Sequence, residues 1–77
     1  AYLMRNSLAE AIDHSIRAIH LDPNSIEAYG NLGMAYERQG NTDEALRNYG
    51  KALELARSAG ATGMIRRIEE VMKELKP

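Results

Sequence analysis

The sequence predicts an all-α protein of antiparallel helix-turn-helix repeats that ends in a C-terminal capping helix. A chain of 77 residues forms one small domain with room for about four helices. It also repeats itself at an offset of 34 residues, a period typical of stacked helical units. The six identical pairs at this offset are Ala1–Ala35, Tyr2–Tyr36, Glu10–Glu44, Ala11–Ala45, Ala18–Ala52 and Leu21–Leu55.

The first part of the chain predicts two helices, a short one over residues 1–5 and a longer one over residues 8–21. Ser7 is followed three positions later by Glu10, and this pairing of a capping residue with a glutamate marks a helix start. Pro23 lacks a backbone N–H and cannot continue a helix. We therefore expect the second helix to end just before this proline.

The central part predicts two further helices, over residues 25–39 and 42–57. Asn24 and Asn41 are capping residues, and each is followed three positions later by a glutamate. Gly40 lies between the two predicted helices, where a glycine takes the left-handed conformation that often ends a helix. A tight turn is therefore expected between them.

The last predicted helix covers residues 63–76. Gly60 and Gly63 mark the connection that precedes it, because glycines are frequent in turns. Its apolar residues recur at helical spacing, so one face is expected to pack on the rest of the protein while the other faces water. The apolar residues are Met64, Ile65, Ile68, Val71, Met72 and Leu75.

Residues 26–59 resemble a tetratricopeptide repeat. The matching residues are Tyr29, Leu32, Gly33 and Tyr36, then Gly40, then Ala45, Tyr49, Ala52 and Leu55. Residues 1–25 resemble the last three-quarters of a preceding repeat. Residues 60–77 lack the Leu-Gly pair and are similar to the solvating helix that closes such arrays. The resemblance implies a single domain with a truncated repeat, a full repeat and a closing helix.

The resemblance also implies a function, because the first helix of each unit in this family lines a concave groove that binds a peptide. The chain is therefore expected to be a non-catalytic protein-interaction module. Asn31 resembles the groove residue that hydrogen-bonds a bound peptide. The family's carboxylate clamp is not expected, because Ala61 and Ile65 stand where its cations belong. The implied groove residues are Glu27, Asn31, Met34, Glu37 and Arg38.

A second hypothesis is structural, namely that the chain is a self-association segment of a larger repeat protein. A short helix over residues 1–5 leaves part of the next helix uncovered, and an apolar patch of this kind marks an interface. We therefore expect homo-oligomers in which a second copy completes the packing. The residues expected at this interface are Leu3, Met4, Leu8, Ile12 and Ile16.

Composition argues against several other classes of function. A net charge of −1 gives no electrostatic drive toward nucleic acid or an anionic membrane. His14 and His20 are six apart and do not share a helix face, so no metal site is expected. The sequence has no nucleophile turn, no phosphate-binding glycine loop and no calcium loop, so no cofactor and no enzyme activity are expected. The absence of cysteine favours a reducing, cytoplasmic location. The chain begins at Ala1 without a leader, and we expect it to be a fragment of a longer protein.

Overall fold

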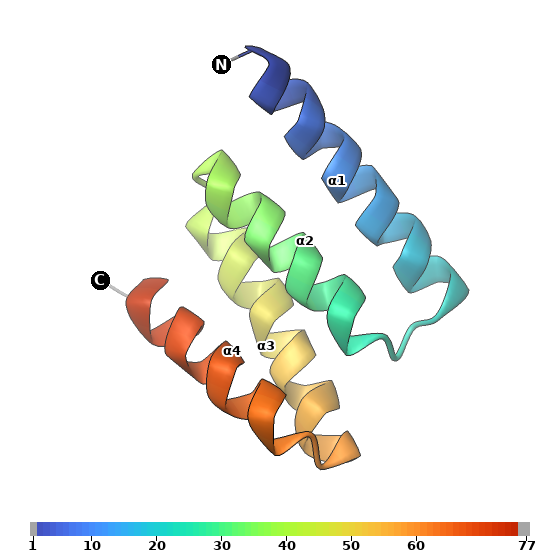
Figure 1. Cartoon of the computed structure of the whole chain (residues 1–77), viewed down its shortest axis with the longest axis vertical. Coiled ribbons are helices and arrows are strands. Elements are labelled where there is room, and N and C mark those ends of the chain that lie inside the picture. The colour runs from blue at the N-terminus through green and yellow to red at the C-terminus, as the bar shows by residue number, and fades with distance from the viewer. Residues whose placement is uncertain (1, 76–77) are drawn as a thin grey trace.

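The computed structural model describes the backbone of residues 2–75 and the side chains of residues 7–75. Four helices and no strands occupy this range, and each helix runs antiparallel to the one before it (Figure 1). Consecutive helices make the main contacts, so the chain forms a short stack of the predicted all-α class. The helices are α1 (Tyr2–Leu21), α2 (Ile26–Gln39), α3 (Thr42–Ala59) and α4 (Thr62–Leu75).

Small residues allow α2 and α3 to approach closely. Ala45 and Ala52 of α3 are fully buried, and the Tyr49 ring between them is only 5% exposed. A Cβ atom at Gly33 of α2 would lie 3.0 Å from this ring. The tyrosine therefore occupies space that only a glycine at position 33 leaves open, and this crossing fixes how the two helices pack.

Three of the predicted signals at the helix ends are confirmed, namely Gly40, Gly60 and Asn41. Gly40 and Gly60 follow α2 and α3 with φ values of 87° and 69°, the left-handed conformation that glycine adopts without strain. The Asn41 side chain accepts a hydrogen bond from the Glu44 backbone N–H at 3.4 Å and so caps α3.

Two end signals act differently from the prediction. Ser25, not Asn24, caps α2, because its Oγ accepts a bond from the Ala28 N–H at 3.1 Å while the Asn24 N–H bonds to Asp22. Gly63 does not punctuate the connection but lies inside the first turn of α4. Gly60 alone provides the left-handed residue that this turn needs.

The predicted break near Ser7 is wrong, because α1 is one continuous helix from Tyr2 to Leu21. The equivalent break one unit later depends on Gly40, whose φ of 87° turns the chain out of α2. Thirty-four residues earlier the sequence has Asn6, which adopts that conformation less readily than glycine. The expected short helix over residues 1–5 is therefore the first part of α1.

Helix α4 packs its apolar stripe against α3, as predicted. Ile68 is buried in the core, and its neighbours Ile65, Val71, Met72 and Leu75 pack around it. An ion pair of 3.1 Å between Arg57 of α3 and Glu69 also joins the two helices. Met64 was predicted to belong to this stripe but is 40% exposed, so one end of α4 turns an apolar side chain outward.

Candidate functional site

Two hollows flank α2, one between α1 and α2 and the other between α2 and α4. Their volumes are about 280 and 230 Å³. Asn31 and Met34 line both of them, so these two side chains form a ridge between the hollows. Both are exposed, and Met34 retains 42% of its surface. This ridge places a hydrogen-bonding amide next to an adaptable apolar side chain.

The hollow between α2 and α4 has an apolar floor and charged edges. Glu27 from α2 and Arg67 from α4 line it and are both exposed, and no ion pair joins them among the residues that the structure describes. Gly30 leaves open space on the α2 side, since nothing lies within 4 Å of a Cβ atom built there. The apolar lining consists of Ile26, Met34, Tyr49, Met64, Ile68 and Val71.

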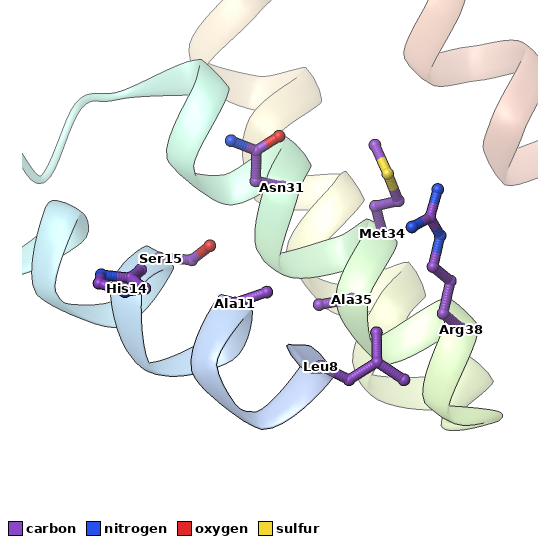
Figure 2. A pocket seen from close by; sticks show the side chains of 8 residues that line it. All are labelled: Leu8, Ala11, His14, Ser15, Asn31, Met34, Ala35 and Arg38. Carbon is purple, nitrogen blue, oxygen red and sulfur yellow. The ribbon is translucent and has the colours of Figure 1, made fainter. Parts of the chain in front are cut away.

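The hollow between α1 and α2 is shown in Figure 2, where Asn31, Met34 and Arg38 follow one face of α2. On the α1 side, Ser15 is buried and points its hydroxyl into the space between the helices. Ala35 of α2 is also buried there. The residues that line this hollow include no carboxylate, and Arg38 carries its only permanent charge.

Glu37 belongs to the predicted groove residues but lines neither hollow, and it contacts Tyr49 of α3. Its Oε1 accepts a hydrogen bond of 2.9 Å from the Tyr49 hydroxyl, which ties α2 to α3. Burial of the phenol and this bond raise the pKa of Tyr49 well above its ordinary value of about 10. The tyrosine therefore stays a neutral donor, and Glu37 orients the ring that contacts Gly33.

The structure places the other four predicted groove residues on α2 around the two hollows. Glu27 lines the α2–α4 hollow, Arg38 lines the α1–α2 hollow, and Asn31 and Met34 line both. Sequence reasoning missed the α4 side, which contributes Met64, Arg67, Ile68 and Val71. Extending the 34-residue period to α4 makes Met64 the equivalent of Gly30 and Ile68 the equivalent of Met34, so the period could have identified these two residues. No pattern in the sequence identifies Arg67.

The residues predicted for self-association are only partly exposed. Ile16 is 38% exposed, whereas Leu8 and Ile12 are half-buried, and Leu8 also lines the α1–α2 hollow. The side chains of Leu3 and Met4 lie outside the described residues. Among the side chains of α1 that the structure describes, residues 7–21, the most exposed large apolar one is Leu21, at 88%, which was not predicted for this interface.

Within residues 2–75, no helix is long and apolar enough to span a membrane. Over the same range, no three histidine, cysteine, aspartate or glutamate side chains gather where they would hold a metal ion. The two hollows offer apolar surface, the amide of Asn31 and the charged side chains of Glu27, Arg38 and Arg67.

Comparison with known proteins agrees with this geometry. A family model described as "Tetratricopeptide repeat" matches residues 26–58, and one described as "TPR repeat" matches residues 1–40. The solution NMR structure of a tetratricopeptide repeat domain protein from Salinibacter ruber is similar, with a TM-score of 0.84 and 24% sequence identity. The likeness covers 97% of this chain and 76% of that one, and at this identity it concerns the fold. No match was found among curated proteins.

Proposed function

Because the chain belongs to the tetratricopeptide repeat family, whose repeats generally mediate protein–protein interaction, we propose that it is a non-catalytic module that binds a peptide segment of another protein. The observation that carries the proposal is the ridge of Asn31 and Met34, which borders both hollows on α2. We further propose that residues 1–25, 26–59 and 60–77 act as a truncated repeat, a full repeat and a closing helix.

An extended peptide fits the α2–α4 hollow on chemical grounds. A volume of about 230 Å³ with an apolar floor accommodates one large apolar side chain of the peptide. The Asn31 amide offers both a donor and an acceptor to the peptide backbone beside that side chain. Glu27 and Arg67 carry opposite charges on two different helices, so they favour one orientation of a charged peptide over the other.

The proposal is tested by selecting twelve-residue peptides from a random displayed library against the immobilised chain. Affinities of the selected peptides are then measured for the wild-type protein and for Asn31→Ala. We expect about tenfold weaker binding by the variant, since a lost hydrogen bond leaves a peptide group unpaired. Arg47→Ala is the matched control, because Arg47 is exposed on α3 away from both hollows.

Equal affinity of the wild type and Asn31→Ala for every selected peptide would contradict the proposal that peptides bind beside Asn31. Helicity measured by circular dichroism is expected to be the same for both proteins, because Asn31 is exposed. A loss of binding without a loss of helicity is therefore attributable to the surface.

A second candidate function is self-association through α1, favoured by the 38% exposure of Ile16. Its test is the mass in solution by light scattering over a concentration series. A dimer has twice the 8.6 kDa of the chain, and Ile16→Asp is expected to return it to a monomer while Arg47→Asp leaves it unchanged. A wild-type mass of 8.6 kDa at all concentrations would exclude this candidate.

A further inference from the structure

Helix α2 contains two interior glycines, and the fold explains only one of them. Gly33 makes room for the ring of Tyr49, which a Cβ atom at that position would meet at 3.0 Å. Gly30 lies three residues earlier, has no positive φ, and has nothing within 4 Å of a Cβ atom built on it. A glycine inside a helix is destabilising relative to alanine. Packing within the described part of the chain therefore gives no reason for a glycine at position 30.

Gly30 borders the hollow between α2 and α4, which has room for a side chain from outside. The hollow measures about 230 Å³ and its floor includes the buried Ile68. For comparison, an engineered apolar cavity of about 150 Å³ binds a molecule of benzene. The side chain that Gly30 lacks is thus open volume at the edge of an apolar space large enough for an aromatic ring.

The lining of this hollow suits an aromatic ring. Met34 of α2 and Met64 of α4 both line it, and both are exposed. Thioether sulfur makes favourable contacts with aromatic rings, and methionine adapts its shape to the group that it contacts. The bare helix backbone at Gly30 allows a flat ring to approach closely. Each of the two helices therefore offers an exposed thioether to the same ring.

We infer that Gly30 is a specificity-determining residue, which admits the ring of a phenylalanine from the bound peptide into the α2–α4 hollow. The inference rests on the proposed function, since it names the side chain that the groove accepts. Glu27 and Arg67 line the same hollow with opposite charges, and no ion pair over residues 7–75 includes either of them. By charge complementarity, the phenylalanine of the partner has one basic and one acidic residue near it.

Parallel selections test the inference at the level of peptide sequence. Twelve-residue peptides from one random displayed library are selected against the wild type, Gly30→Leu and Gly63→Leu. Leucine at position 30 occupies open volume of the hollow and competes with the ring. The wild type is expected to enrich phenylalanine at one position, with a basic and an acidic residue near it, whereas Gly30→Leu is not. Gly63→Leu is the matched control and is expected to behave as the wild type, because a Cβ atom there also meets nothing within 4 Å but Gly63 lines neither hollow.

Affinities measured by fluorescence anisotropy give the size of the effect. One peptide selected by the wild type is compared with a version in which its phenylalanine is replaced by alanine. The wild type and Gly63→Leu are expected to bind the phenylalanine peptide about tenfold more tightly, because the ring is buried in the hollow. In Gly30→Leu this preference is expected to disappear. Circular dichroism is expected to show that Gly30→Leu is folded, since leucine favours a helix more than glycine does.

The methionine methyl signals locate the ring independently of any variant. In NMR titrations of the wild type, the phenylalanine peptide is expected to shift the methyl signals of Met34 and Met64 upfield, and the alanine peptide is not. Met72 lines neither hollow and is the internal control.

Three results would overturn the inference. The first is a set of peptides that bind the wild type without a recurring phenylalanine. The second is a preference for the phenylalanine peptide that persists in Gly30→Leu. The third is a phenylalanine peptide that leaves the signals of Met34 and Met64 in place. If those peptides still bind less tightly to Asn31→Ala, the proposed peptide groove stands and only the role of Gly30 fails. A selection that yields no binding peptide contradicts both.

Discussion

Helices α1 and α3 hold equivalent positions in two successive 34-residue units, yet the same residues are buried in one and open in the other. Ala45 of α3 has no exposed surface, whereas Ala11 of α1 is exposed. Leu55 is half-buried, and its equivalent Leu21 is 88% exposed. The pattern of small residues indicates which face of a helix is suited to close packing. Whether that face is buried depends on whether another helix lies against it.

The largest expected effect tests this contrast directly, by placing leucine at the two equivalent alanines. Ala45→Leu is expected to lower the free energy of unfolding by about 1–3 kcal/mol, because a fully buried site has no room for the added atoms. Ala11→Leu is expected to change it by less than about 0.5 kcal/mol, since that position opens into a hollow. Urea denaturation measures both, and equal losses would mean that the α1 face is covered in solution.

The free energy of unfolding is expected to depend on pH through Tyr49 of α3. Its equivalent on α1 is Ser15, which does not titrate. Burial and the bond to Glu37 raise the pKa of the folded phenol, so the unfolded chain loses this proton first as the pH rises. The contribution of the protonated phenol to the free energy of unfolding is fully present below pH 10. Above pH 10 it is expected to fall by up to about 1.4 kcal/mol per pH unit.

Tyr49→Phe is the control for this pH dependence, because it keeps the ring but has no phenolic proton. The free energy of unfolding of the variant is expected to fall less steeply above pH 10 than that of the wild type. Identical slopes in urea titrations at several alkaline pH values would show that the decline comes from other groups.

The close approach at Gly33 distinguishes the α2–α3 crossing from the rest of α2. Gly33→Ala is expected to destabilise the protein by about 1 kcal/mol, because its Cβ atom meets the ring of Tyr49 at 3.0 Å. Gly30→Ala in the same helix meets nothing within 4 Å and is expected to stabilise by about 0.5–1 kcal/mol. Thermal unfolding compares the two, and stabilisation by both would show that the ring moves aside freely.

The contrast between α1 and α3 also explains how much of the molecule was predictable. The Gly33–Tyr49 crossing and the left-handed Gly40 follow from residue size and backbone freedom, which the sequence contains. The exposure of Met64 and the position of Arg67 depend on how α4 rotates against α3, and local sequence does not define that rotation. The hydrogen bond from the Tyr49 hydroxyl to the Glu37 carboxylate joins residues twelve apart on two helices, and local sequence gives no sign of it.

The smallest expected effect concerns where α1 and α3 begin, since Ser7 and Asn41 are equivalent positions. Asn41→Ala removes a cap whose hydrogen bond is long, at 3.4 Å, and is expected to cost about 0.5–1 kcal/mol. Ser7→Ala lies inside the continuous α1 and is expected to stabilise by a few tenths of a kcal/mol, roughly the difference in helix propensity. Thermal unfolding that shows similar losses for both variants would mean that Ser7 caps a helix in solution.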